Sequence, residues 1–196
     1  HILVGKNFQD FSDHLGVLAR EILAVAFQEV MVAVAQQVGY PKTAQGQGVA
    51  YGLFGLGKFG GEALGYASDI ELLFVYEDEG ETDGETPCTN GHFFNTVIKQ
   101  LDDFIEAKQH GIFELDFRLR PHGDAGPFAV SLNNFKQYYG EKGGAHAYEH
   151  LALIRLNPVV GDDTFVNQVL SLRDDYVYLN ERVDLQDIWV LRKKQY

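Results

Sequence analysis

Residues 54–77 read FGLGKFGGEALGYASDIELLFVYE, and the six residues from Gly55 to Gly60 match the G-x-G-x-x-G pattern of dinucleotide-binding loops. That pattern joins a strand to a helix and then to a second, parallel strand that ends in an acidic residue. Glu77 stands at the expected end, but only residues 61–67 separate the glycines from the next predicted strand. A parallel crossover needs a dozen or more residues. The short connection therefore argues against an NAD site.

The same stretch carries two carboxylates, Asp69 and Glu71, at the start of the second predicted strand. Side chains alternate along a strand, so both point to one face of the sheet. A third carboxylate, Asp116, lies in another predicted strand, residues 112–121, and joins them if the two strands pair. Three convergent carboxylates need a cation, and Mg²⁺ favours carboxylate oxygens together with phosphate oxygens. The sequence therefore predicts a metal and phosphate site.

The glycine loop and two arginines fit this interpretation. Glycines let the backbone approach a ligand closely, and Lys58 adds a positive charge beside them. Arg118 and Arg120 are of the type that binds phosphate, because a guanidinium group matches its geometry. Each feature also has a plain structural alternative: a solvated strand face, an ordinary turn, or an ion-pair network of the arginines with Asp116 or Glu114. The conjunction of all three favours the site.

Composition limits the remaining possibilities. The chain has 196 residues, of which 45% are hydrophobic, which is enough for a packed core. Its 28 acidic and 16 basic residues give a formal charge of −12, so a nucleic acid partner is not expected. Charged residues interrupt the long apolar segment 15–38, so neither a membrane span nor a membrane partner is predicted. A single cysteine, Cys88, and the absence of a signal peptide pattern favour the cytoplasm.

Hydrophobic periodicity predicts an order of elements along the chain. A helical pattern over residues 8–38 indicates one long amphipathic helix or two that join near Gly16. The further predictions are strands at 49–56, 69–76 and 112–121, a short strand or turn at 128–132, helices at 91–108, 133–139 and 145–156, and helical patterns to the C-terminus. The last residues end in a helical pattern without a cap, which suggests a longer polypeptide.

Three ordered motifs carry a family resemblance. They are GLGKFGGEALGYASDIELLFVY (55–76), FELDFRLRPHGDAGPFAVSLNNFKQYY (113–139) and AYEHLALIRLNPVVGD (147–162). Together they resemble the glutamine synthetase adenylyltransferases, whose nucleotidyltransferase domains belong to the DNA polymerase β superfamily. The resemblance implies an α+β, polymerase β-like fold: a small mixed sheet flanked by helices, followed by the start of a helical bundle. It divides the chain into an N-terminal helical segment (1–40), a nucleotidyltransferase domain (41–160) and a C-terminal helical segment (161–196).

The resemblance also implies a reaction and a set of site residues. Family members transfer AMP from ATP to a tyrosine of glutamine synthetase, or remove it by phosphorolysis, and full-length members carry one domain for each direction. By position, the catalytic and metal-binding residues are Asp69, Glu71 and Asp116, which would hold one or two Mg²⁺ ions. The nucleotide-binding residues are Gly57, Lys58, Gly60, Gly61, Ser68, Arg118 and Arg120.

Two positions depart from the family pattern. Glu71 stands where the family usually has aspartate, and Tyr148 precedes Glu149 where a tryptophan is usual. The longer Glu71 side chain leaves two alternatives open: an active nucleotidyltransferase, or a catalytically weakened nucleotide-binding regulatory domain of the same fold. A nucleotidyltransferase for small molecules is a third alternative. The motifs do not decide between attachment and removal of AMP.

Overall fold

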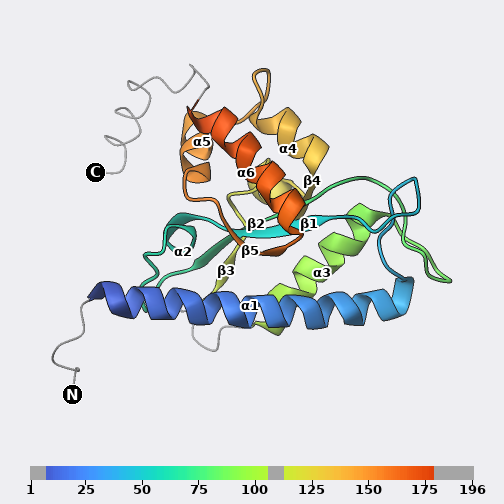
Figure 1. The fold of residues 1–196 in the computed structure, drawn as a ribbon, viewed down its shortest axis with the longest axis horizontal. Coiled ribbons are helices and arrows are strands. Elements are labelled where there is room, and N and C mark those ends of the chain that lie inside the picture. Colours follow the sequence, from blue (N-terminus) through green and yellow to red (C-terminus); the bar gives the residue numbers. More distant parts are fainter. Residues whose placement is uncertain (1–7, 106–112, 179–196) are drawn as a thin grey trace.

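The computed structural model describes residues 8–105 and 113–178, and Figure 1 shows their arrangement. The elements in chain order are α1 (Phe8–Val38), β1 (Tyr51–Gly55), α2 (Gly57–Gly60), β2 (Ile70–Tyr76), α3 (Asn90–Phe104), β3 (Leu115–Asp116), the 3₁₀ helix η1 (Gly123–Ala125), β4 (Ala129–Ser131), α4 (Leu132–Tyr139), α5 (Ala147–Leu153), β5 (Asn157–Gly161) and α6 (Asp163–Tyr178). The predictions for the C-terminal segment 179–196 and for the end of the helix over 91–108 lie outside the described residues.

The strands form one small mixed sheet with the order β3-β2-β1-β5, and β4 also pairs with β2. Strand β1 is antiparallel to both β2 and β5, whereas β3 and β4 run parallel to β2. The predicted α+β fold, a small mixed sheet flanked by helices, is confirmed. None of the helices in the described residues is long and apolar enough to cross a membrane.

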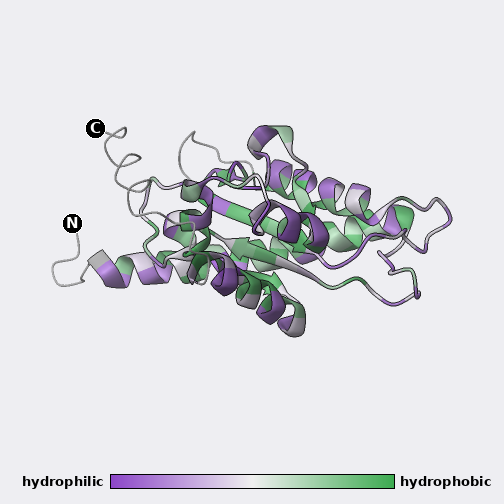
Figure 2. Cartoon of the chain, turned by 90° about the horizontal axis from the view of Figure 1, so that it is seen from above, coloured by the Kyte–Doolittle hydropathy of each residue, from purple (hydrophilic) through white to green (hydrophobic). Residues whose placement is uncertain are grey.

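Helices cover both faces of this sheet, which explains the continuous apolar run in β2. Leu72 and Phe74 pack in one core with α1 and α3, while Leu73 and Val75 pack in a second core with α4, α5 and α6. A strand that is buried on both faces reads as unbroken apolar sequence. Figure 1 shows α1 and α3 on one side of the sheet and α4 to α6 on the other, and in Figure 2 hydrophobic residues gather between these layers.

The first helical pattern forms a single helix, α1, rather than two. Gly16 lies inside it, and a Cβ at that position would meet no heavy atom within 4 Å. Helix α1 shares one hydrophobic core with α3 and the sheet. The division of the chain at residue 40 stays a prediction.

Two predicted elements differ from the structure. The strand predicted over 112–121 is reduced to Leu115–Asp116, because the chain then turns, with Arg120 N donating to Phe117 O and Gly123 N to Arg120 O. The helical pattern predicted after residue 145 is interrupted by β5. In β5, Pro158 lies beside an irregularity in the pairing with β1, a position where a strand tolerates proline.

Candidate active site

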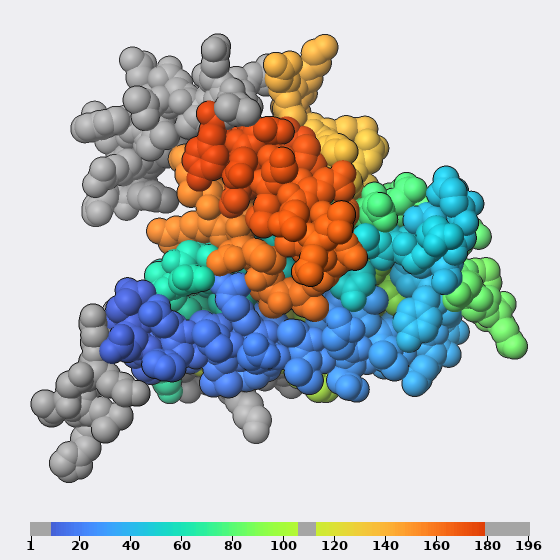
Figure 3. All heavy atoms as spheres, viewed as in Figure 1, coloured from blue at the N-terminus to red at the C-terminus, as the bar shows by residue number. Residues whose placement is uncertain are grey.

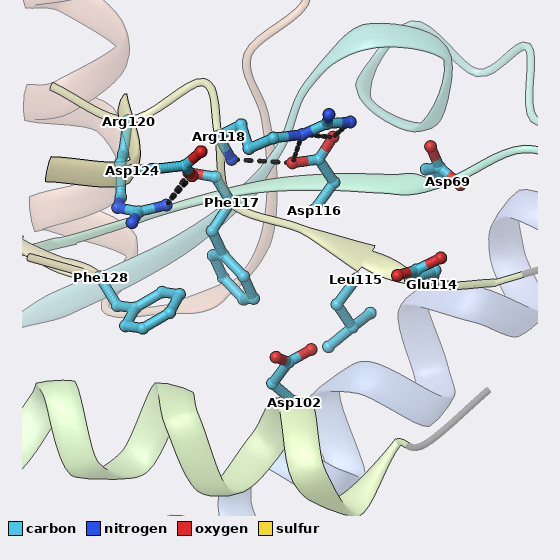
Figure 4. Close-up of a pocket in the computed structure, with 10 residues that line it drawn as sticks. All are labelled: Asp69, Asp102, Glu114, Leu115, Asp116, Phe117, Arg118, Arg120, Asp124 and Phe128. Carbon is cyan, nitrogen blue, oxygen red and sulfur yellow. Dashed lines mark hydrogen bonds and ion pairs between the residues drawn. The ribbon is translucent and has the colours of Figure 1, made fainter. Parts of the chain in front are cut away.

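The sheet brings two of the three predicted carboxylates side by side. In the parallel register of β2 and β3, Glu71 lies opposite Asp116, so both side chains leave the same face. Asp69 comes just before β2, and it lines a cavity of about 480 Å³ together with Asp116 (Figure 4). The predicted pairing of the two acidic strands is therefore confirmed, while the chemical roles of these residues stay predictions.

The Asp116 carboxylate forms an ion pair with Arg118, which lies two residues further along the chain. Arg118 Nη2 donates to Oδ2 at 2.6 Å, Arg118 Nε donates to both carboxylate oxygens at 3.0 Å, and the Arg118 N–H donates to Oδ1 at 2.8 Å. Partial burial raises the pKa of Asp116. The hydrogen bonds from Arg118 and the positive charges of Arg118 and Arg120 together lower it by more, so the pKa of Asp116 lies below its usual value. Asp116 is therefore ionised, and the exposed Arg118 side chain neutralises it.

Glu71 is held by the glycine loop. Its Oε2 accepts a hydrogen bond from the Lys58 N–H at 3.1 Å. Gly57, with φ of +52°, lies so close that a Cβ there would be 1.5 Å from Glu71 Oε2. The backbone conformation thus favours glycine, and any side chain at this position would displace the Glu71 carboxylate.

The three carboxylates lie near the start of the neighbouring strands β2 and β3 but do not form one ligand cluster. Within residues 8–105 and 113–178, no three carboxylate, histidine or cysteine side chains are grouped closely enough to hold a metal ion. Asp116 and Glu71 instead accept hydrogen bonds from Arg118 and Lys58. The donor set still fits Mg²⁺, because it consists of oxygens and because the Arg118 side chain that competes for Asp116 lies at the surface.

Two other predicted nucleotide ligands have structural roles. Arg120 is 5% exposed, and its guanidinium donates to Phe117 O at 2.7 Å and Gly126 O at 3.1 Å and stacks on the Phe128 ring. Burial lowers its pKa. The Ser68 hydroxyl, also buried, accepts from the Gly65 N–H at 3.2 Å. These groups shape the loops around the site, and their predicted contact with nucleotide is untested.

The remaining loop residues lie where the sequence predicted. Lys58 is exposed on α2, directly after β1. A Cβ at Gly60 would be 2.0 Å from Arg155 O and 2.4 Å from Gly55 O, so the loop is packed against residues that follow α5. Gly61 is exposed beside the Arg155 side chain.

Three residues near the site were missed from the sequence. Asp102 of α3 lines the cavity with Asp69 and Asp116, and burial, reinforced by the charges of Asp103 and Glu114, raises its pKa. Asn157 Nδ2 donates to Gly60 O at 3.1 Å, and Arg155 Nη1 donates to Gly57 O at 3.4 Å. Arg155 and Asn157 lie within the third motif (147–162), but the motif assigned them no role, because sheet pairing and helix packing, which the sequence does not display, bring all three residues to the site.

Glu149, which the third motif contains, is buried away from these groups. Its carboxylate accepts from the Tyr138 hydroxyl at 2.7 Å and from the His146 N–H at 2.8 Å, at the start of α5. This arrangement fixes the N-terminus of α5, as an acidic residue at the third helical position commonly does.

Comparison with known proteins gives consistent matches. Residues 2–171 match the family model described as glutamate-ammonia ligase adenylyltransferase. A relative from Thioalkalivibrio sulfidiphilus is 36% identical over 82% of this chain, and one from Acinetobacter baylyi is 32% identical over 88% of it. Both are named bifunctional glutamine synthetase adenylyltransferase/adenylyl-removing enzyme. The chain spans 17% and 19% of the length of these two relatives.

Proposed function

Since this chain belongs to the glutamate-ammonia ligase adenylyltransferase family, we propose that it is a Mg²⁺-dependent nucleotidyltransferase domain acting on glutamine synthetase. It would transfer AMP from ATP to a tyrosine hydroxyl of that protein, or remove the AMP by phosphorolysis. The observation that supports this proposal best is the pairing of Glu71 with Asp116 directly beside a glycine loop. The names of the relatives support glutamine synthetase as the partner.

In this proposal the acidic residues hold the cation and the loop holds the phosphates. Asp69, Glu71 and Asp116 would supply oxygen ligands, and bound Mg²⁺ would offset the charge of phosphate oxygens. The glycine loop leaves space for a phosphate group to approach the backbone. Asp116 and Glu71 become available as ligands once Arg118 and the Lys58 N–H release them.

Arg118 has a second role in the proposed reaction. Its guanidinium, freed from Asp116, would turn toward the phosphate chain of a nucleotide bound in the cavity, since Arg118 lines that cavity together with Asp69 and Asp116. An arginine that binds developing phosphate charge lowers the barrier of a group transfer. The Asp116–Arg118 pair would thus keep the site electrically balanced before the nucleotide and the cation arrive.

One observation favours the alternative of a weakened regulatory domain. The Glu71 carboxylate reaches back to the loop and accepts from the Lys58 N–H, which a shorter aspartate would not do in the same way. If Glu71 stays there, the domain would bind nucleotide without turning it over.

Transfer of label from ATP separates these functions. The protein is incubated with Mg²⁺, glutamine synthetase and ATP that is labelled at the α-phosphate, and Asp116→Asn serves as the inactive control. Label on glutamine synthetase with the wild type alone supports transfer. Removal is followed as the release of labelled ADP from adenylylated glutamine synthetase in the presence of phosphate. ATP binding with neither reaction supports the regulatory alternative, and no binding at all contradicts the proposed function.

A further inference from the structure

We propose that Arg155 binds the phosphate chain of the nucleotide, as a further cationic residue of the site; this inference rests on the proposed function. Neither the glycine pattern nor the RLRP motif includes this residue, and the third motif (147–162), which does contain it, assigns it no role. It follows α5 and comes two residues before the start of β5.

Sheet pairing places Arg155 beside the glycine loop. Asn157 lies opposite Gly55, the last residue of β1, in the antiparallel pairing of β1 and β5. Arg155 precedes Asn157 by two residues, so it extends beyond the end of β1, where the loop begins. Figure 3 shows the residues before and in β5, in orange, in contact with the teal segment that follows the glycines.

The Arg155 side chain crosses the loop. Its Nη1 donates to Gly57 O, and its Cδ and Nε are 2.9 and 3.2 Å from where a Cβ on Gly61 would lie. The Arg155 backbone carbonyl occupies the corresponding space at Gly60. The two glycines that follow Lys58 and Phe59 therefore leave room for the backbone and the side chain of this arginine.

The guanidinium of Arg155 is available for an anion. Its hydrogen bond to Gly57 O is long, at 3.4 Å, and the acceptor is an uncharged carbonyl. Arg118 by contrast is bound to a carboxylate, and Arg120 is buried among carbonyl groups. Among the described residues, Arg155 has no ion pair, and its side chain is exposed.

The charge of the site calls for such a residue. The Glu71 carboxylate lies against Gly57, and Arg155 donates to the Gly57 carbonyl, so only Gly57 separates the guanidinium from Glu71, one of the predicted metal ligands. Three carboxylates and a polyphosphate carry more negative charge than one or two Mg²⁺ ions offset. Lys58, Arg118 and Arg155 would supply the remaining positive charge, and an arginine fork suits phosphate oxygens.

Two variants distinguish nucleotide binding from a purely structural role, in which Arg155 only holds the loop through its hydrogen bond to Gly57 O. Arg155→Gln keeps an N–H donor for the carbonyl and removes the charge, whereas Arg155→Lys keeps the charge. Lys136→Ala is the matched control, because it removes an exposed positive charge from α4, on a helix remote from α2 (Figure 1).

The test is equilibrium binding of ATP, ADP and AMP in Mg²⁺, with thermal melting of each variant. If Arg155 binds the phosphate chain, R155Q weakens ATP binding about tenfold or more, ADP binding less and AMP binding within about twofold, while R155K retains most of the ATP affinity. Lys136→Ala behaves as the wild type.

Equal weakening for all three nucleotides, or a lowered melting temperature with an unchanged preference for ATP over AMP, would overturn the inference and leave Arg155 with the purely structural role. Unchanged ATP binding by R155Q would overturn it too. A wild type that binds none of the three nucleotides would instead contradict the proposed function itself, so the two failures are distinguishable.

Discussion

Gly57→Ala separates the conformational role of the loop from its role in holding Glu71. At φ of +52° an L-residue costs roughly 1–2 kcal/mol relative to glycine. The new Cβ would also lie 1.5 Å from Glu71 Oε2 and 2.2 Å from Glu71 Cδ. A Cβ needs about 3 Å of separation from a neighbouring heavy atom, so the carboxylate must move by roughly 1.5 Å.

Because the clash is with the end of a flexible side chain, it changes the site more than the stability. We expect the free energy of unfolding to fall by about 1–2 kcal/mol, measured by urea denaturation. A displacement of more than about 1 Å in a reacting group lowers the rate by about 100-fold, so AMP transfer should fall by that order. Shortening the neighbour in the double variant Gly57→Ala/Glu71→Asp should recover part of the rate but not the stability.

Gly16→Ala is the matched control. It also replaces a glycine, but inside α1, where the added Cβ meets no heavy atom within 4 Å. Alanine favours a helix interior over glycine by about 1 kcal/mol, so this variant should be more stable and equally active. If Gly57→Ala matched Gly16→Ala in both measurements, the Gly57–Glu71 contact would have no bearing on the site.

Three further predictions concern the cavity. Burial raises the pKa of Asp102 above its unfolded value, so the ionised group costs stability at neutral pH; Asp102→Asn should raise the free energy of unfolding at pH 7, and the gain should vanish below about pH 4, where the unfolded carboxyl is protonated too. A pH-independent gain would contradict this origin. Arg118→Ala removes the group that competes for Asp116, so Mg²⁺ should bind several-fold more tightly in isothermal titration without nucleotide; weaker binding would show that Arg118 does not compete. Arg120→Met leaves the Gly126 carbonyl without its donor and the Phe117 carbonyl with only the backbone N–H of residue 120, so urea unfolding should show a loss of about 1–3 kcal/mol, and an unchanged stability would refute the structural role.

Local sequence was sufficient for the central strands and for the position of Glu71 on β2. The LLFVY run of β2 is apolar on both faces because two separate cores pack against it. The strand could therefore be predicted without knowing which helices and strands surround it. The strand predicted over 112–121 failed after Asp116, since alternation cannot show that the carboxylate of Asp116 bonds back to the Arg118 N–H and that a turn follows. Strand β5 was not predicted, because proline is unusual within a strand and because the irregular pairing at Pro158 cannot be seen in the sequence.

The contacts that position the glycine loop all join residues far apart in the chain. Ser12 Oγ of α1 donates to Leu64 O at 2.6 Å, and the Arg20 guanidinium lies 5.1 Å from the centre of the Phe59 ring. Asn157 approaches the same loop from β5. A glycine pattern indicates that the backbone lies close to another group, but contacts with residues distant in the sequence determine which group that is. Here the Lys58 N–H of the loop donates to Glu71, and Ser12 of α1 holds Leu64 by a hydrogen bond. Residues 61–67 therefore do not form the crossover helix that a dinucleotide site requires.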